Sequence, residues 1–398
     1  MGNMISNWVL MSAVARDELG TPRFIFTDHP HCLRFELDGC PGTVPQIRKL
    51  IAWAFKEAHD CLTNKLLFGI PIVEFGIPPG MIIDNPNNTE PGYSFLTDER
   101  NVFVKRPGLL LCKVFGSSKP DIANYFGHVV GNEIIWNIGN CRLYLDHGQR
   151  FLELLITANE FTHGQPTRGS EVLSTTYVNL PNLPRSLIFS GGQVINALRV
   201  NKTDSTTGHT QLIPHFMPSE AYTLHYYYIA LCRELEQELA WRAYGPIISK
   251  SYQAYMYTGP SGRWNVPRLT MILKQGTSKF LGDDSAFGVS LLRQLLIPIY
   301  HHHCSSKYRA DELKDEDARE ADELGDFQSG HSSQTARIHY GVEHRTHGHI
   351  SEIKWRALQQ VMFCFDNWVS SDIGTHSTLK VSTTFGKLGI GSNAARTM

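Results

Sequence analysis

The chain has 398 residues, of which 42% are hydrophobic, and its formal net charge is −1 at pH 7. This length suits two domains better than one, and the apolar content is sufficient for a substantial buried core. The balanced charge excludes a global attraction to polyanions, so a nucleic-acid surface would have to come from local segregation of cations.

The first part of the chain is predicted to be mainly helical. Residues 45–67 carry apolar side chains at helical spacing, and the Pro-, Gly- and Asn-rich residues 76–92 then predict a loop. Residues 151–161, FLELLITANEF, indicate a buried helix. The expected regions are an N-terminal one at 1–145, which would clamp DNA from one side, a catalytic one at 146–370 and a flexible tail at 371–398.

The second region is predicted to combine helices with a small sheet. Short β-prone runs in residues 186–217 flank a turn-rich segment, which indicates an antiparallel hairpin that carries Lys202. The fold class expected is therefore α+β, mostly α-helical, with one small antiparallel sheet. Further helices are expected at 219–244, 285–300, 331–340 and 351–368.

A basic and aromatic stretch lies between Leu239 and Gly282, which contains no acidic residue. A stretch whose charged residues are all positive, in a near-neutral chain, is typical of a surface that contacts phosphates. Arg263, Arg268 and Lys274 are therefore expected to bind a DNA substrate. The alternative is an ordinary solvated surface with core aromatics. The six cations of this acid-free stretch are Arg242, Lys250, Arg263, Arg268, Lys274 and Lys279, and its interleaved aromatic residues are Trp241, Tyr244, Tyr252, Tyr255, Tyr257 and Trp264.

Four motifs occur in an informative order. They are TRGSEVL from residue 167, Lys202 in the expected hairpin, LLRQLL from residue 291 and GHSSQTARIHY from residue 330. Each motif alone is more simply explained by ion pairs or core packing. In this order, over residues 150–345, they resemble the tyrosine recombinases, the phage-integrase-like family.

The resemblance implies breakage and rejoining of DNA through a 3′-phosphotyrosine. The resemblance implies that Tyr340 is the nucleophile and that the guanidiniums of Arg168 and Arg293 bind the phosphate. It also implies that Lys202 donates a proton to the leaving oxygen, and that His331 hydrogen-bonds the phosphate or exchanges the phenol proton. These types suit the chemistry, because paired guanidinium donors stabilise developing phosphate charge and imidazole titrates near neutrality. The scheme needs no metal and no nucleotide cofactor.

Several residues depart from the family pattern or compete with it. Ser290 replaces the first histidine of the HxxR motif, and a serine can hydrogen-bond a phosphate but carries no proton at neutral pH. A DNA-binding module of the same descent without catalysis is therefore the main alternative. Lys250 is a second candidate for the role of Lys202. Tyr308 lies in the sequence SSKY, which resembles the active-site motif of type IB topoisomerases, but it lies outside the four ordered motifs.

The segment between Arg293 and His331 is long and acidic, and it looks like an insertion in eukaryotic mobile-element recombinases such as fungal cryptons. The scattered cysteines without a secretory signal predict reduced thiols, and a nuclear protein is expected. No apolar run is long and clean enough to span a bilayer, so no membrane partner is expected. The His301–Cys304 run leaves a metal-binding scaffold as a third alternative. The apolar face of residues 351–368 predicts self-association on DNA.

Overall fold

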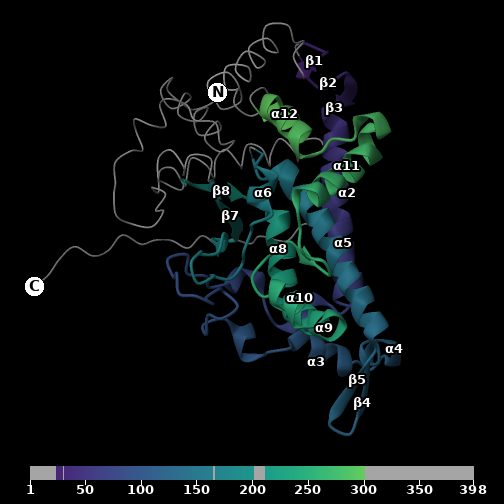
Figure 1. Cartoon of the computed structure of the whole chain (residues 1–398), viewed down its shortest axis with the longest axis vertical. Coiled ribbons are helices and arrows are strands. Elements are labelled where there is room, and N and C mark those ends of the chain that lie inside the picture. The colour runs from purple at the N-terminus through teal and green to yellow at the C-terminus, as the bar shows by residue number, and fades with distance from the viewer. Residues whose placement is uncertain (1–23, 30, 165, 201–210, 301–398) are drawn as a thin grey trace, which may run out of the picture.

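The computed structural model of the chain describes residues 24–29, 31–164, 166–200 and 211–300 (Figure 1). The described residues combine helices with small antiparallel sheets, so the expected α+β class is confirmed. None of the described helices is long and apolar enough to cross a membrane. The helices are α2 (Val44–Asp60), α3 (Leu109–Phe115), α4 (Pro120–Ala123), α5 (Ile138–Thr162), α6 (Gly169–Val172), α8 (Ser219–Tyr227), α9 (Arg233–Tyr244), α10 (Pro246–Ser251), α11 (Val266–Leu281) and α12 (Val289–Tyr300).

The described strands form small antiparallel sheets. Two of these sheets have three strands, in the orders β1-β2-β3 and β6-β7-β8, and the other two are the hairpins β4-β5 and β9-β10. The strands are β1 (Phe24–Phe26), β2 (Arg34–Leu37), β3 (Cys40–Thr43), β4 (Gly127–Val130), β5 (Glu133–Trp136), β6 (Leu187–Ser190), β7 (Gln193–Val200), β8 (Gln211–Phe216), β9 (Thr258–Gly259) and β10 (Gly262–Arg263).

The small sheet expected within residues 186–217 is present as β6-β7-β8. Leu187 pairs with Asn196 on β7, and Ile195 of β7 pairs with Phe216 on β8, so the three strands form an antiparallel meander. This part of the prediction is confirmed. The residues between β7 and β8, 201–210, lie outside the described residues, and Lys202 is among them.

The helix α2 begins where the sequence predicts, and it lies beside α5 along the long axis of the molecule (Figure 1). Its first turn carries a proline, and the side chain of Thr43 accepts a hydrogen bond from the backbone N–H of Gln46, which caps the helix. The apolar face that includes Leu50 and Ile51 is buried. A π-helical turn, Cys61–Leu66, continues α2 to the end of the predicted helix.

The expected boundary between residues 145 and 146 falls inside α5. This helix starts with Asn137, whose side chain accepts from the backbone N–H of Asn140, and it runs without a break to Thr162. It packs against α2, α9 and α11, and α9 contacts it on both sides of the expected boundary, at Arg142 and at Gly148. The described N-terminal part also contains β1 to β5 beside its helices, and its role as a DNA clamp stays a prediction.

A buried ion pair within α9 packs against α5. Arg233 is 1% exposed, and its Nη1 donates to Glu236 Oε2 at 2.9 Å. Its Nη2 donates to the carbonyl oxygens of Tyr255, at 2.9 Å, and of Met256. Disrupting such a pair is costly, because it leaves an uncompensated buried charge.

Gly148 on α5 makes room for this pair. A Cβ atom on Gly148 would lie 1.9 Å from Glu236 Oε1. Gly148→Ala is therefore expected to displace the carboxylate and to lower the free energy of unfolding by at least about 3 kcal/mol, the scale for disrupting a buried pair. Urea denaturation followed by circular dichroism measures this change.

Gly139→Ala provides a control in the same helix. A Cβ atom there would meet only the side-chain oxygen of Asn137, at 3.3 Å, so the free energy of unfolding is expected to change by less than about 1 kcal/mol. Equal denaturation midpoints for the two alanine variants would contradict the proposed role of Gly148.

Candidate functional site

Arg168 lies at the start of α6, directly after the turn that follows α5. Its backbone is extended, with φ −82° and ψ 141°, and its backbone N–H donates to Glu171 Oε2 at 3.2 Å. Its Nη1 donates to the other oxygen of the same carboxylate, also at 3.2 Å. Glu171 therefore holds both the main chain and the guanidinium of Arg168, and 29% of the Arg168 side chain stays exposed.

Close packing at Gly169 brings α6 to the beginnings of two later helices. A Cβ atom at Gly169 would lie 3.3 Å from Val266 at the start of α11 and 3.4 Å from Val289 at the start of α12. Arg293 follows Val289 by one helical turn, and residues four apart share one face of a helix. The face of α12 that carries Arg293 is thus the face that meets α6.

The guanidiniums of Arg168 and Arg293 are consequently near one another. Arg293 is half-buried, and burial lowers its pKa from the ordinary value. The positive charge of Arg168 lowers the pKa of Arg293 further, whereas Glu171 raises it. Two cations that share a single neighbouring carboxylate repel each other, and an anion bound at this place would offset that repulsion.

Two more of the residues expected from the sequence border this place. Ser290 is exposed and precedes Arg293 by three positions, so the two side chains are neighbours on the surface of α12. Lys274 of α11 is exposed, and its Cε atom lies 3.6 Å from where a Cβ of Gly288 would stand, immediately before α12. Arg168 thus lies at the start of α6, Arg293 and Ser290 on α12 and Lys274 on α11, and α11 contacts both of the other helices.

The other expected catalytic residues fall outside the described part of the chain. These are Lys202, His331 and Tyr340, and the same holds for Tyr308, for the His301–Cys304 run and for residues 351–368. Their roles stay predictions. Within the described ranges, no three His, Cys, Asp or Glu side chains converge as a metal site would require.

The cations of the acid-free stretch divide into two groups. Arg242 pairs with Glu238 at 2.8 Å, and Arg268 pairs with Glu153 on α5 at 3.2 Å. Lys250, Arg263, Lys274 and Lys279 are exposed, and no carboxylate of the described residues lies within 4 Å of them. The absence of acids within the stretch therefore does not make all of its cations available, because acids from elsewhere neutralise two of them.

Arg263 lies on an aromatic platform that sequence reasoning did not find. Its guanidinium carbon is 3.8 Å from the centre of the Tyr255 ring. Both residues belong to the acid-free stretch, and the sequence Gly259-Pro260-Ser261-Gly262 between them is a turn signal. That signal could have indicated the hairpin, although the stacked geometry depends on how the hairpin meets the rest of the fold.

Comparisons with protein-family models, with curated proteins and with solved structures gave no match.

Proposed function

We propose that this protein breaks and rejoins double-stranded DNA through a 3′-phosphotyrosine, with the chemistry of a tyrosine recombinase. The meeting of Arg168 and Arg293 is the observation that carries the proposal. These residues come from separate motifs far apart in the sequence, and the positive charge of Arg168 is close enough to lower the pKa of Arg293. Nothing in the periodicity of either helix requires them to meet.

A phosphodiester under attack gains negative charge on its nonbridging oxygens. Two permanently charged guanidiniums that are already positioned stabilise that charge without reorganising, because each donates hydrogen bonds in pairs. Glu171 orients Arg168 by accepting a hydrogen bond from its guanidinium. Arg293 is half-buried, and this burial strengthens its interaction with an anion. Lys274 adds a further cation at the start of α12 for a neighbouring phosphate.

The remaining steps of the proposed mechanism belong to residues outside the described ranges. The phenol oxygen of Tyr340 attacks phosphorus and forms the phosphotyrosine bond. The 5′ oxygen leaves with a proton that Lys202 donates, and His331 hydrogen-bonds the phosphate or accepts the phenol proton. A 5′-hydroxyl that attacks the phosphotyrosine reverses these steps and rejoins the strand, in the nucleus according to the resemblance.

A DNA-binding protein without catalysis is the second candidate. Ser290 favours it, because this exposed serine occupies the position of the family's proton-carrying histidine. The two candidates differ in one measurement. Incubation of the full chain with a nicked duplex should yield a protein–DNA adduct on a denaturing gel if catalysis persists, whereas DNA binding without any adduct would favour the inactive module.

Lys274→Ala is expected to weaken binding to all duplexes alike. Each phosphate contact releases condensed counterions, so its loss should make the slope of log K against log salt concentration shallower by about 0.9. Fluorescence anisotropy with a labelled duplex over a series of sodium chloride concentrations measures the slope.

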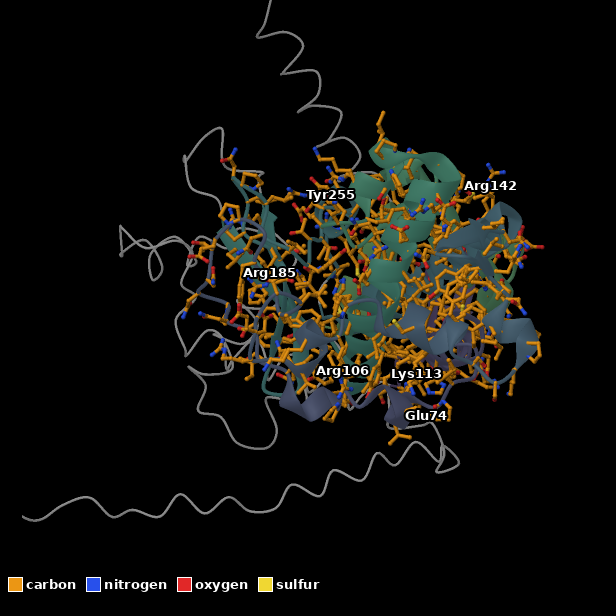
Figure 2. The ribbon with its side chains drawn as sticks, turned by 90° about the horizontal axis from the view of Figure 1, so that it is seen from below. Glu74, Arg106, Lys113, Arg142, Arg185 and Tyr255 are labelled. Carbon is orange, nitrogen blue, oxygen red and sulfur yellow. The ribbon has the colours of Figure 1, made fainter. Side chains whose placement is uncertain are left out.

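Lys113→Ala is the matched control for this measurement. Lys113 pairs with Glu74 at 3.7 Å, and these two residues lie toward the opposite edge of the molecule from Tyr255 (Figure 2). Its removal should leave the slope unchanged. If Lys274→Ala and Lys113→Ala gave the same slope, Lys274 would have no phosphate contact.

A further inference from the structure

We infer that Arg263 determines sequence specificity by reading the edge of a guanine in the major groove, and that Tyr255 holds its guanidinium for this task. The inference rests on the proposed function, since it takes duplex DNA as the ligand. It goes further by giving Arg263 a role different from that of Lys274, which contacts a phosphate in the proposed function.

The platform under Arg263 is firmly anchored. Tyr255 is half-buried, its carbonyl oxygen accepts a hydrogen bond from the buried Arg233, and it forms a β-bridge with Thr176 soon after α6. Arg263 is exposed and pairs with Thr258 across the β9-β10 hairpin. The hairpin turns through Gly262, whose φ of +87° favours glycine.

A separation of 3.8 Å between the guanidinium carbon and the ring centre is van der Waals contact, which favours a parallel stack. In such a stack the N–H donors point outward around the edge of the guanidinium plane. The stack also restricts the rotamers of a long side chain, so less conformational entropy is lost when the donors engage a ligand.

The other arginines of the acid-free stretch also lie over aromatic rings, but their guanidinium donors are already hydrogen-bonded to carboxylates. Arg268 also lies over an aromatic ring, that of Trp264 at 4.2 Å, but its Nη2 already donates to Glu153. Arg242 lies over Trp241 and donates to Glu238. For Arg263, no described side chain or carbonyl group accepts a hydrogen bond from the guanidinium, so its paired donors are available to a ligand.

A planar fork with two available donors matches the O6 and N7 acceptors of guanine, the base contact that arginine makes most often. A phosphate that is not cleaved can be contacted by a single positive charge, which Lys274 supplies on α11. The position of the hairpin also favours a groove, because Arg263 precedes by three residues the Val266 side chain that packs on Gly169 beside Arg168. With the cleaved phosphate at Arg168, the hairpin lies at an adjacent part of the duplex.

The test begins with the full chain and a pool of randomised 30-base-pair duplexes. Selection of bound duplexes should enrich sequences with a guanine at one fixed position. Replacing that base pair should weaken binding by about 5- to 150-fold, which is the discrimination of one bidentate contact. Arg263→Ala and Arg263→Lys should bind the guanine-containing and the replaced duplex equally, with an unchanged salt slope.

Three variants complete the experiment. Tyr255→Phe should retain discrimination, because the ring face remains, whereas Tyr255→Leu should reduce it. Lys274→Ala should weaken binding to both duplexes equally and keep their ratio. Thermal unfolding of each variant by circular dichroism shows whether it is folded.

Several results would overturn the inference. An Arg263→Ala protein with a shallower salt slope and equal losses on both duplexes would make Arg263 a phosphate contact. Guanine preference that persists in both Arg263 variants, or that is lacking in the unmutated protein, would also overturn it while leaving the proposed function intact. If the unmutated protein bound no duplex at all, the proposed function would fail together with the inference.

Discussion

Tyr340→Phe is expected to abolish the covalent protein–DNA adduct and to leave DNA binding nearly unchanged, because only the attacking oxygen is removed. The substrate is a duplex with a nick a few nucleotides beyond the cleavage position. Cleavage there releases a short 5′-hydroxyl fragment that diffuses away, so the strand cannot be rejoined and the phosphotyrosine accumulates. A denaturing gel with a labelled strand measures the adduct, and anisotropy measures binding.

Tyr308→Phe is the matched control, since it removes the same oxygen from the competing tyrosine. This variant should form the adduct at the rate of the unmutated protein. An adduct that persists in Tyr340→Phe and disappears in Tyr308→Phe would identify Tyr308 as the nucleophile and contradict the role assigned to Tyr340.

Arg168→Ala and Arg293→Ala should each slow adduct formation by at least about a hundredfold, the scale for the loss of one preorganised donor to a developing oxyanion. Binding should weaken much less, because many phosphate contacts share the affinity. Arg293→Lys should be slow as well, since a lysine retains the charge but not the paired donors. Single-turnover rates on the nicked duplex, at saturating protein, separate the chemical step from binding.

Arg142→Ala controls for the general loss of a positive charge. Arg142 is exposed, its guanidinium lies 5.5 Å from the ring centre of Tyr244, and Figure 2 shows it well apart from Tyr255. The adduct rate of this variant should match that of the unmutated protein. Full activity in Arg168→Ala or Arg293→Ala would mean that the two guanidiniums do not bind the reacting phosphate.

Elements with a strong local pattern could be predicted from the sequence. The helices α2 and α5 and the sheet β6-β7-β8 occur where the apolar periods of residues 45–67, 151–161 and 186–217 indicate them. Periodicity reports how one segment buries its own apolar face, so it predicts an element without knowledge of its neighbours. The expected division near residue 145 lies within the continuous helix α5, and the domain division stays a prediction.

The candidate site could also be predicted only in part from the sequence. Arg168 and Arg293 could be identified from the residues around them, so the motifs and their order follow from the sequence. The proximity of these two guanidiniums, the pairing of Arg268 with Glu153 and the contact of Arg263 with Tyr255 are known from the structure alone. The physical reason is distance along the chain: charge pairing and stacking depend on partners from other elements, and packing at glycines such as Gly169 sets how closely those elements approach.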